Sequence, residues 1–197
     1  MGPSLYLTRM NLPLSDAWEA EQIALFTPSE RARLARISRP RRRAQFVVAH
    51  CMLRSALASR GAHNALVEVD AEGRLHLHAG VAVYASISHS QEFVATIAAS
   101  EPVGVDLESK TRKWDPDAAA AMLELSVDAD TPDALLRAWV TAEARLKAGP
   151  GASPHVWLSR WEGCQLAVAG IQKPPLTGVF DGITGIYNVL ELKWDAV

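Results

Sequence analysis

Stretches in which apolar residues recur at helical spacing alternate along this chain with stretches in which apolar and polar residues alternate. The first forty residues predict two helices with a break near Pro28. Thr27, Pro28 and the acidic Glu30 form a typical helix start. The segment after Pro40 predicts a long helix, which Gly61 ends.

Strand-like alternation dominates the middle of the chain and its end. Strands are predicted at LYLTRM, ALVEVD, RLHLH, AVYASISHS, EFVATIAAS, VGVDLE, HVWLSRW, CQLAVAG and GIYNVLELKW. Helical spacing returns over residues 117–125 and 131–148, followed by a loop at GPGASP. The order of helix then strands therefore occurs twice. This predicts an α+β fold of two similar lobes related by a pseudo-twofold, divided as residues 1–100 and 101–197.

Composition and charge are those of an ordinary globular domain, with 49% hydrophobic residues, 21% charged residues and a net charge of −2. Seven arginines between residues 31 and 43 form a local basic run. No aromatic residues accompany that run as a stacking platform, so nucleic-acid binding is not expected. Two distant cysteines, no signal-peptide pattern and no membrane-spanning run lead us to expect a cytoplasmic protein without a membrane partner.

Acidic residues recur in the segments GVDLES and WVTAEARLK. Asp106 and Glu108 are two apart in a strand and therefore share a face, whereas Glu143 and Lys147 are four apart on one side of a helix. If the helix lies over the strand, three carboxylates and an ammonium group meet, which suits magnesium and a bound diphosphate. The alternative is a solvated strand and an ordinary surface ion pair on the helix.

These segments resemble motifs of the 4'-phosphopantetheinyl transferases of the surfactin-synthetase-activating type. That family carries G-[IV]-D-[IVL]-E, and later W-x-x-K-E-[AS]-x-x-K; this chain has GVDLE and WVTAEARLK in the same order. The family's N-I-S-H-S element corresponds to SISHS, residues 86–90, and its basic helix to RRRAQFVVAHCMLR. The similarity covers approximately residues 31–149.

The resemblance implies two similar lobes with the active site in the cleft between them. It implies magnesium-dependent transfer of the phosphopantetheine arm of coenzyme A to a serine of an apo acyl or peptidyl carrier protein, releasing adenosine 3',5'-bisphosphate. The implied metal ligands are Asp106, Glu108 and Glu143, and the implied catalytic residues are Glu143, as the base, and Lys147. The implied coenzyme A contacts are Arg31, Arg33, Arg74, Ser88 and His89. Lobes paired within one chain lead us to expect a monomer.

Two departures from the family pattern keep other functions open. Ala142 stands where the family has a lysine, and the linker between the two acidic motifs matches poorly. A degenerate relative that binds a carrier protein or coenzyme A without catalysis is therefore one alternative. An unrelated α+β interaction domain is another.

Overall fold

A computed structural model describes residues 2–69, 75–78, 80, 82–112, 121, 131–180 and 187–197. The fold is mixed α+β, as the sequence predicts. Its helices are α1 (Asp16–Ala24), α2 (Pro28–Ala35), α3 (Pro40–Ala58) and α5 (Pro132–Ala148). The helix expected over residues 117–125 falls almost wholly outside the described part of the chain.

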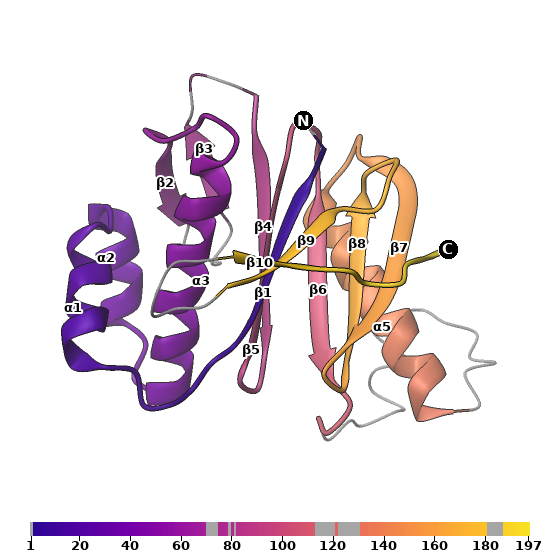
Figure 1. The fold of residues 1–197 in the computed structure, drawn as a ribbon, viewed down its shortest axis with the longest axis horizontal. Helices are drawn as coiled ribbons and strands as arrows, with labels where there is room; N and C mark the ends of the chain where they lie inside the picture. Colours follow the sequence, from indigo (N-terminus) through magenta and orange to yellow (C-terminus); the bar gives the residue numbers. More distant parts are fainter. Residues whose placement is uncertain are drawn as a thin grey trace.

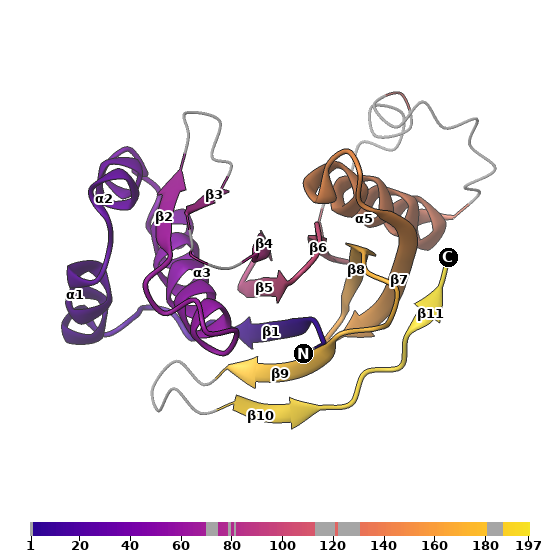
Figure 2. The same ribbon diagram turned by 90° about the horizontal axis from the view of Figure 1, so that it is seen from above.

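Two sheets stand side by side, each covered by one long helix (Figures 1 and 2). The strands of the first sheet, in spatial order, are β10 (Tyr187–Leu190), β9 (Leu176–Phe180), β1 (Ser4–Arg9), β5 (Phe93–Ala99) and β4 (Tyr84–Ser90). Those of the second are β11 (Asp195–Ala196), β7 (Ser153–Trp161), β8 (Cys164–Gly170) and β6 (Gly104–Ser109). Helix α3 packs on β5 and β4, whereas α5 packs on β6 and β8.

A small hairpin of β2 (Leu66–Val69) and β3 (Leu75–His78) lies beside α2. The predicted helix start is confirmed, because the side chain of Thr27 accepts the N–H of Glu30 while Glu30 binds the N–H of Thr27. The long helix after Pro40 is also confirmed, and Gly61 follows it with a φ of 75°.

The C-terminal part of the chain differs from the predicted elements. β7 begins at Ser153, inside the expected loop, and β10 covers only four residues of the expected last strand. β9 was not predicted, because its short segment follows two prolines and includes Gly178. β9 pairs in parallel with β1, so β9 and β10 extend the first sheet, and the sheets do not follow a division at residue 100.

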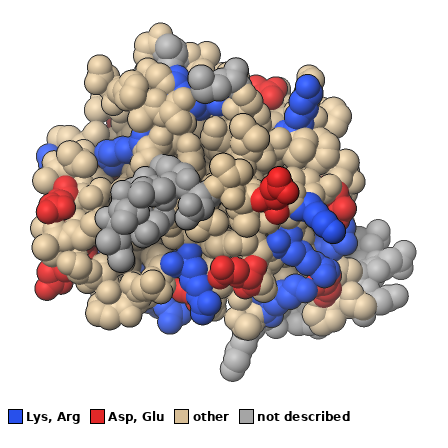
Figure 3. Space-filling view, in the orientation of Figure 1, with Lys and Arg blue, Asp and Glu red and all other residues tan. Residues whose placement is uncertain are grey.

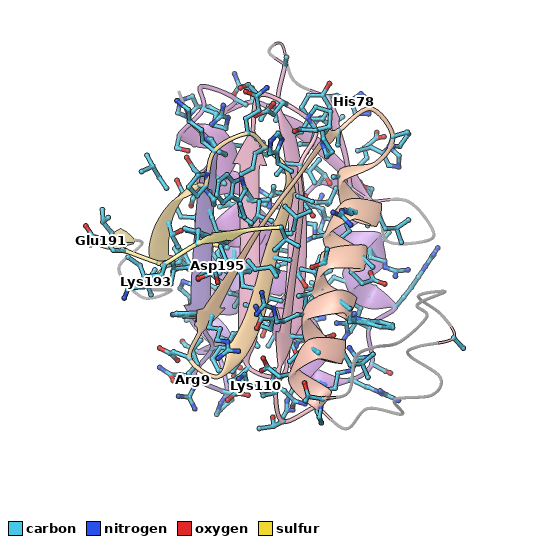
Figure 4. The ribbon with its side chains drawn as sticks, turned by 90° about the vertical axis from the view of Figure 1, so that its right-hand side faces the viewer. Arg9, His78, Lys110, Glu191, Lys193 and Asp195 are labelled. Carbon is cyan, nitrogen blue, oxygen red and sulfur yellow. The ribbon has the colours of Figure 1, made fainter. Side chains whose placement is uncertain are left out.

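A hydrophobic core joins the two sheets on the face away from the helices. Leu5 and Ile97 of the first sheet and Leu107 and Leu166 of the second are fully buried in it. The segment between β10 and β11 packs against this core through Trp194 and neighbouring apolar residues. Glu191, Lys193 and Asp195 mark the course of this segment in Figure 4. The core therefore ties the two sheets into one body.

Gly104 allows α5 to approach β6 at backbone contact. A Cβ atom at this position would lie 2.0 Å from the carbonyl oxygen of Ala144 and 2.5 Å from the nitrogen of Ala148. Backbone atoms of a helix cannot move away as a flexible side chain can. The glycine of the GVDLE segment is therefore required by packing, since it sets the depth at which α5 lies over the acidic strand.

We predict that Gly104→Ala lowers the free energy of unfolding by about 2–3 kcal/mol or more, because the added methyl group overlaps α5. Urea unfolding followed by tryptophan fluorescence measures the change. Gly80→Ala is the matched control, because a Cβ at Gly80 meets nothing within 4 Å; we expect a change below about 0.5 kcal/mol. Equal unfolding midpoints for the two variants would contradict the packing argument.

A buried ionic group stabilises the contact between α2 and α3. Glu30 is fully buried and accepts hydrogen bonds from the Thr27 N–H at 2.7 Å, from His50 Nδ1 at 2.7 Å and from Arg54 Nη2 at 2.5 Å. Burial raises the pKa of Glu30, but the bonds from His50, Arg54 and Thr27 outweigh burial and hold it at about 2. Burial also lowers the pKa of His50, so the pair consists of a carboxylate and a neutral imidazole.

We predict that Glu30→Gln lowers the free energy of unfolding at pH 7 by about 3 kcal/mol. The pKa of Glu30 in the folded state lies below its ordinary value of 4.5, so its contribution is complete above pH 4.5 and is lost as the pH falls toward 2. Denaturant unfolding at several pH values should show the difference from the unchanged protein shrinking across that range.

Glu92→Gln is the control for this prediction, because its ion pair with Arg9 is exposed, with a 3.4 Å separation. Its effect should stay below about 1 kcal/mol at every pH. A Glu30→Gln effect that is the same at pH 3 and pH 7 would show that the charge of Glu30 does not matter.

Candidate functional site

β6 carries the acidic pair, and its side chains alternate between two environments. Val105 and Leu107 are fully buried in the core that joins the sheets. Asp106 and Glu108, 4% and 8% exposed, lie on the other face, the one on which Gly104 meets α5. The expectation that the two carboxylates share a face is confirmed. They are buried, so the alternative of a solvated strand is wrong for β6.

Three serines of β4 satisfy the free edge of β6. β6 is the last described strand of its sheet, so its N–H groups that point away from β8 have no strand partner. Alternate serine hydroxyls accept these N–H groups. The bonds are Val105 N to Ser86 Oγ at 3.1 Å, Leu107 N to Ser88 Oγ at 3.1 Å and Ser109 N to Ser90 Oγ at 3.0 Å. The SISHS segment thus joins the two sheets through side chains.

Two of these serines also bind the carboxylates. Ser88 donates its hydroxyl proton to Asp106 Oδ1 at 2.8 Å, and Ser90 donates to Glu108 Oε2 at 2.6 Å. All four side chains are buried. Two segments separated by 18 residues therefore form one polar cluster in the middle of the molecule.

Lys147 brings α5 into the same cluster. Its ammonium group donates to Asp106 Oδ1 at 2.7 Å and to the carbonyl oxygen of Val105 at 3.2 Å. The other oxygen of Asp106, Oδ2, is buried and has no hydrogen-bond partner among the described residues. A buried carboxylate oxygen without a partner is costly, and it suits a site that a cation or a donor group fills.

Glu108 is held from two sides. Ser90 binds Oε2, and Arg112 forms an ion pair with Oε1. The guanidinium group of Arg112 also lies 5.7 Å from the ring centre of Trp139 on α5. Burial raises the pKa of Glu108, the negative charge of Asp106 adds to the increase, and Ser90 and Arg112 oppose it. Burial is the largest of these effects, and the net result is a raised pKa for Glu108.

Glu143 lies on α5, one turn before Lys147, and is half-buried. It makes no hydrogen bond or ion pair within the described residues. That part of the chain also contains no group of three acidic, histidine or cysteine side chains arranged to hold a metal ion. The structure thus brings together Asp106, Glu108 and Lys147, whereas Glu143 lies nearby without joining them.

The residues of this cluster fit a magnesium ion, because Oδ2 of Asp106 is a carboxylate oxygen without a partner among the described residues. Magnesium binds hard oxygen ligands, and in phosphate enzymes it commonly takes one or two carboxylates with substrate phosphates and water. The unpartnered oxygen of Asp106 and the nearby Glu108 provide that minimum.

A basic cavity of about 550 Å³ opens beside Glu108. Residues from both sheets and from the start of α3 line it: Arg39, Arg41, Arg42, Gln45, His89, Ser90, Gln91, Glu108 and Arg112. Four arginines, one carboxylate and one histidine suit a ligand that carries phosphates together with a bound cation.

His89 lies at this cavity as a neutral group. Nη1 of Arg42 is 2.6 Å from its Nε2 and 2.7 Å from its Nδ1. Burial and the charge of Arg42 lower the pKa of His89 to about 4. Burial also lowers the pKa of Arg42, and the charges of Arg33 and Arg39 lower it further. Several positive charges therefore gather at the start of α3.

The other residues expected to contact coenzyme A are not among the described residues that line the basic cavity. Arg31 donates a hydrogen bond to the carbonyl oxygen of Phe26. Arg33 lies close enough to Arg42 to affect its pKa, and Arg74 lies outside the described residues. Arg39, Arg42 and Arg112 were not assigned individually; the arginine run indicated the first two, and Arg112 had no sequence signal.

A second cavity, of about 790 Å³, lies on another side of α5. Its lining includes Arg137, Thr141, Ala142, Arg145 and Leu146, along with residues of β7 and the C-terminus. Ala142, the departure from the family pattern, therefore faces this cavity rather than the cluster around Asp106. The missing lysine leaves the bonds of Asp106 and Lys147 unaffected.

Positive and negative side chains are mixed on the face shown in Figure 3. Two of the basic residues labelled in Figure 4 form ion pairs: Arg9 pairs with Glu92, and Lys110 pairs with Asp133. Among the described residues, no helix has the length and apolar content needed to cross a bilayer.

No protein-family model matches the chain, and no curated protein matches it either.

We predict that Lys147→Met lowers the free energy of unfolding by about 2 kcal/mol, because Asp106 stays buried without its counter-charge. Thermal unfolding with and without magnesium measures the effect. Magnesium should raise the melting temperature of Lys147→Met more than that of the unchanged protein, since a cation replaces the ammonium group at Asp106.

Arg160→Met is the matched control, because Arg160 pairs with Asp133 in an exposed position, at 2.6 Å. We expect a loss below about 0.5 kcal/mol and no dependence on magnesium. If magnesium stabilises neither Lys147→Met nor the unchanged protein, Asp106 does not bind the cation; equal stabilisation of the two would show that the cation does not replace the ammonium group.

Proposed function

We propose that this chain transfers the 4'-phosphopantetheine arm of coenzyme A to a serine of an apo acyl or peptidyl carrier protein. One observation carries the proposal. The three segments that resemble the transferase family meet at a single point, where Ser88 of SISHS and Lys147 of WVTAEARLK both bind Asp106 of GVDLE. Ser88 and Lys147 are 18 and 41 residues from Asp106 in sequence, so their meeting at this one carboxylate supports the resemblance.

The architecture supports the same proposal. Each sheet is covered by one long helix, α3 on the first and α5 on the second, as two similar lobes would be. The basic cavity takes its lining from both sheets, which suits an active site between lobes. A single chain that supplies both sides is expected to work as a monomer, and a coenzyme A enzyme with free cysteines Cys51 and Cys164 is expected in the cytoplasm.

The basic cavity would bind the phosphates of coenzyme A. Arg39, Arg42 and Arg112 offer charge and planar donor groups, and neutral His89 can donate one N–H. Asp106 and Glu108 would hold a magnesium ion at the diphosphate, and bound magnesium supplies charge neutralisation there. Phosphoryl transfer depends mainly on such positioning and charge neutralisation.

The transfer itself needs a base and a stabilised leaving group. The serine oxygen of the carrier forms a bond to the phosphorus next to the pantetheine, and the phosphoanhydride bond to the adenosine 3',5'-bisphosphate breaks. Glu143 accepts the serine proton, because it is half-buried and not bonded within the described residues. Lys147, one turn further along α5, stabilises the charge on the departing phosphate.

One observation favours a second candidate, a degenerate relative that binds coenzyme A or a carrier protein without catalysis. Lys147 already neutralises Asp106, and Glu143 does not join the cluster. Such an arrangement would bind a phosphate ligand without assembling a catalytic metal site. Ala142, in place of the family lysine, is the sequence feature that keeps this alternative open, although it lines the other cavity.

We predict that an apo carrier protein gains the mass of one phosphopantetheine arm after incubation with this chain, coenzyme A and magnesium. Intact-protein mass spectrometry measures the gain. Glu143→Gln should slow transfer at least about 100-fold, the usual contribution of a general base. Asp106→Asn and EDTA should both abolish transfer, because the substitution removes a metal ligand and EDTA removes the metal ion.

Glu21→Gln is the matched control, since Glu21 is an exposed carboxylate on α1, away from the cluster. Its transfer rate should equal that of the unchanged protein. No transfer to acyl and peptidyl carriers, with coenzyme A still raising the melting temperature, would favour the degenerate binder. If coenzyme A with magnesium does not raise the melting temperature, an unrelated interaction domain is the remaining hypothesis. Full activity of Glu143→Gln at neutral pH would exclude Glu143 as the base.

A further inference from the structure

We propose that Ser88 and Ser90 are positioning residues that hold Asp106 and Glu108 for a divalent cation, and that they do not contact phosphate themselves. The metal site to which this inference refers rests on the proposed function. The role of the two serines is inferred from their hydrogen bonds, and it differs from the phosphate contact that the family resemblance implies for Ser88.

The hydroxyl proton of each serine is already committed. A serine hydroxyl has one proton to donate and two lone pairs that accept. Ser88 donates to Asp106 and accepts the N–H of Leu107, whereas Ser90 donates to Glu108. A phosphate oxygen needs a donor, so either serine could bind phosphate only by releasing its carboxylate. Both serines are also buried, at 5% and 6% exposed.

Each serine closes a small hydrogen-bonded ring with β6. The N–H of Leu107 fixes the oxygen of Ser88, and that hydroxyl fixes Oδ1 of Asp106, the residue before Leu107. Ser90 makes the same ring with the N–H of Ser109 and with Glu108. The N–H groups of β6 thus fix the serines, and each serine in turn holds one oxygen of a carboxylate on the same strand. The second oxygen of Asp106 has no partner in the part of the chain that the structure describes.

Ser86 is a control that the chain itself provides. It accepts the N–H of Val105 at 3.1 Å, the same length as the bond from Leu107 to Ser88. The residue before Val105 is Gly104, which has no carboxylate to orient. Ser86 therefore shares the sheet-joining bond of Ser88 and Ser90 but lacks their bond to an acid. Comparing alanine variants of the three serines therefore separates an effect on stability from an effect on cation binding.

The experiment measures binding of Mn²⁺, a probe for a magnesium site, to the full chain without coenzyme A or a carrier. The electron paramagnetic resonance signal of free Mn²⁺ gives the affinity, and thermal unfolding gives stability. Ser88→Ala and Ser90→Ala should each weaken Mn²⁺ binding about 10- to 100-fold, as loss of a group that orients a metal ligand does. Ser86→Ala should leave the affinity within about twofold, although all three variants lower the melting temperature.

Equal affinities for all three alanine variants would overturn the proposal, as would a failure of the unchanged protein to bind Mn²⁺. If an alanine variant does not fold, Ser88→Cys and Ser90→Cys keep a buried side chain with a weaker donor and should bind Mn²⁺ more weakly than the unchanged protein. The outcome is independent of transfer activity. If Mn²⁺ affinity depends on these serines but the chain does not modify carriers, the proposed function alone is contradicted. If the chain is active but its alanine variants bind Mn²⁺ normally, this inference alone is contradicted.

Discussion

The free edge of β6 is the constraint on which the arrangement of this molecule depends. An edge strand in the middle of a protein cannot leave its N–H groups unsatisfied, and no strand of the described residues forms a ladder with this edge of β6. Serine hydroxyls spaced two residues apart match N–H groups that repeat at about 6.7 Å along the strand. The two sheets therefore meet in one register. A shift of one residue would present Ile87 and His89 to β6 in place of Ser88 and Ser90.

Charge is concentrated at this junction for a related reason. Asp106 and Glu108 are buried on the face that α5 covers, and Lys147 and Arg112 supply one cation to each. These cations and the serine hydroxyls offset the cost of burying two carboxylates there. The polar cluster is thus a structural joint and a charged site at the same time. Substitutions in it will alter stability and ligand affinity together unless a control such as Ser86 separates them.

Much of the fold could be predicted from local patterns, because caps, alternation and helical spacing depend on neighbouring residues. The capping box at Thr27 and the shared face of Asp106 and Glu108 are of this kind. The serine bonds could not be predicted, since they require knowing that β4 faces β6 rather than pairing with it. β9 escaped prediction because its strand form depends on pairing with β1, at the opposite end of the sequence.

The pairing of β9 with β1 also affects how the protein is made. β1 is synthesised well before its parallel partner, because Leu5 is in register with Thr177. Until that segment emerges, one edge of the first sheet stays open, and the core beneath it lacks part of its cover. The first sheet is therefore completed only after β9 and β10 have been synthesised.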